Sequence, residues 1–146
     1  NRVRIRILGD IDGLTQSARE AVKKAQEHTA GNTGMQLNIA LNYGARDELV
    51  RAFRLLQQDI EEGRTTLDAV TWEAIAGKLY TCNQPDVDLI IRTSGEQRLS
   101  NFLLAQSAYA EMLFPEKLWP DYTVGDYQDA LKAYAGRERR FGGRTT

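Results

Sequence analysis

Short strand-like segments alternate with helix-like segments along this chain, and this alternation constrains its fold more than any other feature. The strand-like segments are apolar runs bounded by turn residues, at residues 3–8, 35–41, 87–91 and 110–114. The helix-like segments carry apolar residues three and four positions apart, at residues 15–29, 46–62, 71–79 and 123–139, and a further helix is expected to start at Ser100. This order predicts an α/β fold with a largely parallel central sheet flanked by helices.

The composition is that of one globular domain. The chain has 146 residues, of which 42% are apolar and 27% charged, and it contains no repeat or linker, so residues 1–146 are expected to belong to a single domain. Apolar runs such as residues 102–105 are far shorter than the ~20 residues of a membrane span. A net charge of −1 argues against nucleic-acid binding. The single cysteine, Cys82, excludes an intrachain disulfide and favours a reducing, cytoplasmic location.

The segment after residues 87–91 combines residue types that bind diphosphates. In open α/β sheets, ligands bind at the carboxyl ends of strands, where this segment is expected. Arg92 and Arg98 carry forked hydrogen-bond donors, and Ser100 offers a hydroxyl group beside the free N–H groups of a helix start. Glu96 lies between the two arginines and could orient one of them. The same residues also fit a surface Arg-Glu-Arg network in which Ser100 only caps a helix.

Glu111 lies inside an otherwise apolar strand-like segment, residues 109–114. A buried carboxylate needs a partner or a cation, and a carboxylate is the hard oxygen ligand that Mg²⁺ takes in proteins. Because side chains alternate between the two faces of a strand, an outward position on an edge strand explains Glu111 as well.

The C-terminal segment, residues 137–144, is basic and contains glycine. It fits a helix C-terminus, where cations complement the helix dipole and glycine ends the helix. It equally fits an anion-binding arm, and the residues alone leave both interpretations open.

Taken together and in order, these motifs resemble the cis-prenyltransferase family, in particular its bacterial undecaprenyl diphosphate synthases. The resemblance covers essentially the whole chain. The matching segments are residues 29–34, 37–40, 42–46, 92–104, 109–111, 118–121 and 139–143. The chain lacks the Asp-Asp-x-x-Asp box of trans-prenyltransferases, which agrees with the cis family.

The resemblance implies a prenyltransferase that condenses isopentenyl diphosphate with an allylic diphosphate such as farnesyl diphosphate. The product would be a long cis-polyprenyl diphosphate for a cell-wall lipid carrier. By the family pattern, the isopentenyl diphosphate is held by Arg92, Glu96, Arg98, Leu99 and Ser100.

The resemblance also implies a metal ion and a second subunit. Glu111 would help to hold Mg²⁺. Arg140 and Gly142 resemble the family's Arg-x-Gly element, which reaches the diphosphate of the partner subunit in a homodimer. Neither a nucleic acid nor a transmembrane segment is expected, although release of the product would involve a peripheral membrane contact.

One early family motif is not found. Family members carry a strand followed by Asp-Gly-Asn-Gly-Arg-Trp, which supplies an aspartate central to Mg²⁺ handling and a loop for the allylic diphosphate. Here Asp12-Gly13 is followed by Leu14-Thr15, which is a different sequence. The chain is therefore expected to be the C-terminal part of an enzyme, to hold no catalytic residue, to lack most of the hydrophobic tunnel and to be inactive by itself.

Two other classes of function stay open. One is a non-catalytic, family-like binding subunit, although such a subunit need not keep Arg92, Glu96, Arg98 and Glu111. The other is a generic phosphate-binding α/β domain, although the chain has no Gly-x-x-x-x-Gly-Lys-Ser/Thr loop.

Overall fold

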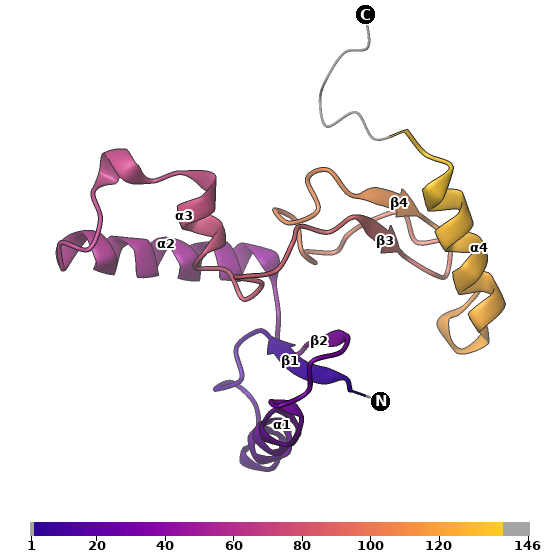
Figure 1. Cartoon of the computed structure of the whole chain (residues 1–146), viewed down its shortest axis with the longest axis horizontal. Coiled ribbons are helices and arrows are strands. Elements are labelled where there is room, and N and C mark those ends of the chain that lie inside the picture. The colour runs from indigo at the N-terminus through magenta and orange to yellow at the C-terminus, as the bar shows by residue number, and fades with distance from the viewer. Residues whose placement is uncertain (1, 139–146) are drawn as a thin grey trace, which may run out of the picture. The chain divides into compact units, whose positions relative to one another are not determined.

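The computed structural model describes residues 2–138 and shows an α/β chain with parallel strands, as the sequence predicted (Figure 1). Its elements are β1 (Arg4–Leu8), α1 (Gln16–Thr29), β2 (Gln36–Ala40), α2 (Ala45–Glu61), α3 (Trp72–Ala76), β3 (Leu89–Ile91), β4 (Glu111–Leu113) and α4 (Val124–Ala135), with short 3-10 helices at Leu67–Ala69 and Trp119–Asp121. The chain divides into two compact units, Asn1–Gln84 (unit 1) and Pro85–Thr146 (unit 2). Each unit holds one pair of parallel strands.

Unit 1 is built on β1 and β2, which pair in parallel with Ile5 opposite Leu37. α1 packs against β1, and α2 packs against α3. α1 begins after Thr15, whose hydroxyl accepts a hydrogen bond from the Ala18 N–H group and so caps the helix. The carboxyl ends of both strands lead into polar turns at the same edge of the pair.

Unit 2 is built on β3 and β4, which pair in parallel with Ile91 opposite Leu113. α4 begins with a capping box in which Thr123 and Asp126 bond to each other's backbone N–H groups. It ends at Ala135, before the expected residue 139, because Gly136 follows and glycine costs about 1 kcal/mol in a helix interior.

The prediction of a helix that starts at Ser100 is wrong. Residues 100–108 form a series of turns instead. The φ angles of Ser100, Asn101 and Leu103 are 49°, 63° and 44°, in the left-handed region that a right-handed helix cannot contain. Turn bonds such as Ser107 N–H to the Leu103 carbonyl, at 3.0 Å, replace helical ones. The residues after the loop therefore do not offer the N-terminus of a helix to a ligand.

The apolar core of each unit is small. Its buried members are Leu8, Val22, Ala45, Ala52, Leu56 and Leu79 in unit 1, and Ile90 and Ala130 in unit 2. Large apolar side chains stay exposed in both units, for example Phe53 at 67% and Trp119 at 72%. Over residues 2–138, no helix is both long and apolar enough to cross a membrane.

Candidate functional site

The loop of residues 92–100 lies at the carboxyl edge of β3 and β4. The Arg92 N–H group donates to the Leu113 carbonyl at 2.9 Å, which extends the pairing of the two strands by one residue. The Ser94 N–H group then bonds to the Lys117 carbonyl and the Gly95 N–H group to the Pro115 carbonyl, both at 2.9 Å. The start of the loop is thereby fixed on the segment that follows β4, at the position where α/β sheets bind ligands.

The backbone of this loop and of the turns after it is strained. Six described residues other than glycine have positive φ, and four of them lie between residues 94 and 103: Ser94, Ser100, Asn101 and Leu103. A left-handed conformation costs a residue with a side chain roughly 1–2 kcal/mol. Such strain persists only where the surrounding structure enforces it, and it concentrates at functional sites. The loop thus differs from an ordinary connection.

Hydrogen-bond donors are in excess in the loop. The backbone N–H groups of residues 96–100 have no acceptor within the described part of the chain. Arg92 forms no ion pair there either. Successive free N–H groups in a turn form a concave anion-binding surface. The same loop also carries the guanidinium groups of Arg92 and Arg98. The arrangement suits an anion with several oxygen atoms.

Glu96 forms an ion pair with Arg98, so Arg98 is the arginine that it orients. The Arg98 side chain remains 67% exposed, whereas that of Glu96 is 35% exposed. One end of the guanidinium group is therefore held by the carboxylate, while its remaining N–H groups face solvent. An arginine held in this way loses less side-chain entropy when it binds an anion.

Glu111 lies at the opposite end of the strand pair from Arg92. It is the first residue of β4, in register with Leu89, and two residues of strand span about 7 Å. Its carboxylate is 24% exposed and pairs with the Arg137 guanidinium at 2.5 Å, directly after α4. The sequence did not identify Arg137 as this partner. Residues 2–138 contain no group of three or more His, Cys, Asp or Glu side chains that could hold a metal ion.

Unit 1 carries a polar cluster that the sequence did not reveal. Glu48 is only 2% exposed, yet it accepts a hydrogen bond from the Tyr43 hydroxyl at 2.5 Å and another from the Tyr80 N–H group at 2.6 Å. Arg51 lies 4.4 Å from the centre of the Tyr80 ring, and burial raises the pKa of the Tyr80 hydroxyl. Glu48, Arg51 and Tyr80, together with Asp10, line a small pocket at the carboxyl edge of β1 and β2.

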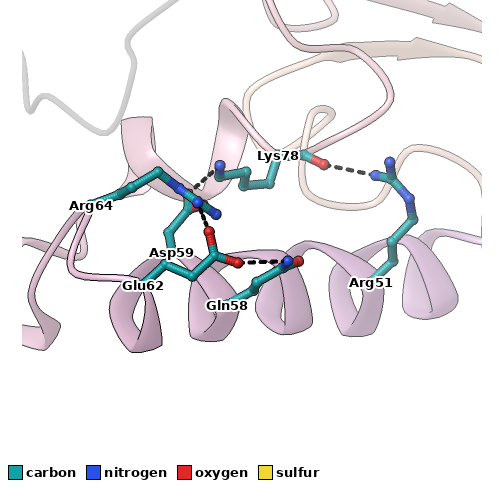
Figure 2. A network of polar contacts seen from close by, with 6 residues as sticks. All are labelled: Arg51, Gln58, Asp59, Glu62, Arg64 and Lys78. Carbon is teal, nitrogen blue, oxygen red and sulfur yellow. Dashed lines mark hydrogen bonds and ion pairs between the residues drawn. The ribbon is translucent and has the colours of Figure 1, made fainter.

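A second polar network in unit 1 joins α2 to Arg64, which follows α2, and to Lys78, which follows α3 (Figure 2). Asp59 pairs with Lys78 and with Arg64, and Arg64 also pairs with Glu62. Arg51 donates to the Lys78 carbonyl at 3.0 Å. The Lys78 ammonium group, followed by Arg64, holds the pKa of Asp59 below its ordinary value. The acids of this network, Asp59 and Glu62, are thus matched by cations from the same network.

The family model described as "Putative undecaprenyl diphosphate synthase" matches residues 1–142 of the chain. The chain belongs to this family. The isoprenyl transferase of Agrobacterium fabrum is 51% identical over 140 residues, which is 96% of the chain and 57% of the relative. The farnesyl-diphosphate-specific ditrans,polycis-undecaprenyl-diphosphate synthase of Escherichia coli is 45% identical over 143 residues, which is 98% of the chain and 56% of the relative.

Solved structures of prenyl diphosphate synthases share the fold. Lavandulyl diphosphate synthase from Lavandula x intermedia, in complex with dimethylallyl diphosphate, has a TM-score of 0.93 at 35% identity and covers 96% of the chain. A probable undecaprenyl diphosphate synthase from Campylobacter jejuni has a TM-score of 0.83 at 36% identity and covers 97%. The chain spans 60% and 64% of those two structures, so it represents somewhat less than two thirds of their length.

Two residues that the family resemblance assigned to the site cannot be placed. Arg140 and Gly142 lie outside the described residues. The structure places Arg92, Glu96, Arg98, Leu99 and Ser100 in one loop and Glu111 apart from it. The residues predicted to bind a diphosphate thus share one loop, whereas Glu111, the predicted metal ligand, pairs with Arg137.

Proposed function

We propose that this chain is the isopentenyl-diphosphate-binding part of a cis-prenyltransferase. The observation that supports this most is the loop of residues 96–100, whose consecutive N–H groups lack acceptors within residues 2–138, at the carboxyl edge of β3 and β4. The membership of the family and the names of its relatives agree with a diphosphate substrate.

The loop contains donors of three kinds for a diphosphate. Arg92 and Arg98 provide charge-assisted, forked contacts to phosphate oxygens. Ser100 provides a hydroxyl group, and the N–H group of Leu99 adds a main-chain donor. Glu96 keeps the Arg98 side chain beside the loop through their ion pair. We infer that these five residues hold the isopentenyl diphosphate.

In the proposed reaction, the diphosphate group leaves the allylic substrate and the isopentenyl double bond attacks the resulting carbocation-like carbon. A proton is then lost, and a cis double bond forms. The diphosphate of the isopentenyl unit is retained in the product throughout. The loop therefore does not stabilise a leaving group. Its task is to orient the double bond toward the allylic carbon, which is a positioning contribution.

We also propose that Glu111 provides one oxygen ligand for Mg²⁺. Its carboxylate is of the chemical kind that Mg²⁺ prefers, but Arg137 contacts it and the described residues group no further carboxylates around it. The remaining ligands would be phosphate oxygens and water. When bound, Mg²⁺ would neutralise charge on diphosphate oxygens.

The assembly and its place in the cell are further parts of the proposal. Arg140 and Gly142 would reach the diphosphate in the partner subunit of a homodimer. The substrates are soluble diphosphates, which suits a cytoplasmic enzyme that touches the membrane only to release its long product. That product would serve as a cell-wall lipid carrier.

Calorimetric titration of the protein with isopentenyl diphosphate tests the proposal. We expect binding that Arg92→Ala weakens tens-fold, because a forked contact to phosphate in a partly desolvated site contributes about 2 kcal/mol. Arg54→Ala, which removes an exposed arginine from α2 in unit 1, is the matched control and should bind normally. Equal affinity of the wild type and Arg92→Ala would contradict the site. Binding without any prenyl transfer by the full-length protein would favour the non-catalytic binding subunit.

A further inference from the structure

Lys117 belongs to the segment after β4 to which the loop of residues 92–100, called the diphosphate loop below, is hydrogen-bonded. Its carbonyl accepts the Ser94 N–H group at 2.9 Å, while the Pro115 carbonyl accepts that of Gly95. Ser94 and Gly95 are both left-handed, with φ angles of 70° and 66°. Because Ser94 is not a glycine, this conformation costs energy, and the bonds to residues 115–117 are what maintain it.

The side chain of Lys117 points to a different element. Its ammonium group lies 2.7 Å from the Oδ2 atom of Asp126, in the first turn of α4. The same oxygen accepts the N–H group and the hydroxyl group of Thr123. The Lys117 ammonium group, followed by Thr123, holds the pKa of Asp126 far below its ordinary value, so the carboxylate stays charged even when the pH falls to that ordinary value of 3.8.

The 115–117 segment and α4 line a common hollow. It has a volume of about 410 Å³, with Leu113 and Pro115 on one wall and Ala130 and Ala133 of α4 on the other. Lys117 and Asp126 also line this hollow, and their ion pair joins its two walls. Lys117 thus makes two connections: its side chain binds α4, and its backbone carbonyl binds the turn at Ser94.

We propose that Lys117 is a positioning residue for the diphosphate loop. It anchors residues 115–117 to α4 and thereby keeps the Ser94–Gly95 turn in its strained conformation, which presents the donors of residues 96–100 in one direction. This inference rests on the proposed function, since it assigns to Lys117 a role in the same site. Without the anchor, the loop must be ordered at the moment of binding, and part of the binding energy is lost.

The test is the affinity for isopentenyl diphosphate of a Lys117→Met variant, which keeps the aliphatic stem and removes the charge. We expect Kd to rise about two- to fivefold, the range that a half-exposed ion pair supports. Lys117→Arg restores the charge and should restore affinity. Lys132→Met is the matched control: it breaks the pair with Asp129 on the same helix, and should leave Kd unchanged. Melting temperatures measured without ligand separate a loss of loop order from a general loss of stability.

The outcomes distinguish the two proposals. If neither the wild type nor Arg92→Ala binds isopentenyl diphosphate, the proposed function fails. If the wild type binds and Lys117→Met binds equally well, only the positioning role is refuted. A Lys117→Arg variant as weak as Lys117→Met would also refute it, because the charge would then not matter. A Kd that rises in Lys117→Met, is restored in Lys117→Arg and is unchanged in Lys132→Met supports it.

Discussion

Both strand pairs of this chain lead into polar turns at their carboxyl edges, but the two sets of turns are bonded differently. In unit 1 several polar side chains have partners within the unit: the Asn42 side chain donates to the Asp10 carbonyl at 2.9 Å, and Glu48 accepts from Tyr43 and Tyr80. The start of α2 has no side-chain cap, and the N–H groups of Ala45 and Asp47 lack acceptors within residues 2–138. In unit 2 the N–H groups of residues 96–100 lack acceptors within residues 2–138.

The backbones differ in the same direction. Within the described residues, unit 1 has positive φ only at glycine and asparagine, the residues that tolerate it: Gly9, Asn42, Gly63 and Asn83. Unit 2 has it at Ser94, Ser100 and Leu103 as well. Both units therefore have polar residues at a carboxyl edge, and within the described residues unit 2 alone adds left-handed residues other than glycine and asparagine there. The following predictions test whether this difference marks the proposed binding site.

The largest effect is expected for Arg98→Ala. It removes a forked donor and also leaves the Glu96 carboxylate without its ion pair, beside the incoming phosphates. Affinity for isopentenyl diphosphate should fall about a hundredfold, more than for Arg92→Ala, which has no such carboxylate to release. Calorimetric titration measures this. The double variant Arg98→Ala with Glu96→Gln should recover part of the loss, and no recovery would show that Glu96 does not act through Arg98.

In unit 1, Glu48→Gln should reduce stability and leave binding alone. The buried Glu48 carboxyl group accepts two donors, whereas an amide has one oxygen, so either Tyr43 or the Tyr80 N–H group loses its acceptor. An unsatisfied buried donor costs about 1–3 kcal/mol. Urea unfolding measures the loss. The Kd for isopentenyl diphosphate should equal that of the wild type, and a weaker Kd would mean that this cluster belongs to the binding site.

Local patterns predicted most of the fold. The strand-like runs of β1, β2 and β4 are encoded within a few neighbouring residues, and the structure has strands there. The segment after Ser100 was misread because a serine before Phe102-Leu103-Leu104 looks like a capped helix. Its conformation is decided by distant groups. The Val87 N–H group bonds to the Gln106 carbonyl at 2.9 Å, and Gln106 itself is buried.

The residue types of the candidate site could be predicted from the sequence, but the partner of each side chain could not. Arg137 lies 26 positions from Glu111, so only the folded chain shows that they pair. The sequence does not single out Glu48, because a single acid in an amphipathic helix usually faces solvent. One signal was present: Glu48 lies on the same helical stripe as Ala45, Ala52 and Leu56, which are all buried. The apolar residue Phe53 lies off that stripe and is exposed.

The strained backbone of unit 2 can be tested by Ser94→Gly. Glycine adopts the φ of 70° without the penalty of about 1 kcal/mol, although it gains entropy in the unfolded chain, so a net stabilisation of about 0.5 kcal/mol is expected. Asn83→Gly in unit 1, at a φ of 64°, is the control and should gain less, since asparagine already tolerates this region. Urea unfolding of both variants measures the difference. A loss of stability in Ser94→Gly would show that the turn is not strained.

The smallest effect concerns acid stability and the paired network of unit 1. The pKa of Asp59 is lowered in the folded chain, mainly by Lys78 and then by Arg64, so folding favours the charged form. The resulting stabilisation is complete above the ordinary value of 3.8 and is lost as the pH falls through the lower folded-state pKa. Asp59→Asn should therefore lose stability at pH 6 but show a smaller further loss between pH 4.5 and pH 2.5 than the wild type. Urea unfolding across this range measures both slopes.

Asp68→Asn, at an exposed carboxyl that forms no ion pair within residues 2–138, should keep the wild-type slope. Equal slopes for Asp59→Asn and the wild type would mean that solvent screens this network, and that its matched charges do not stabilise unit 1 measurably.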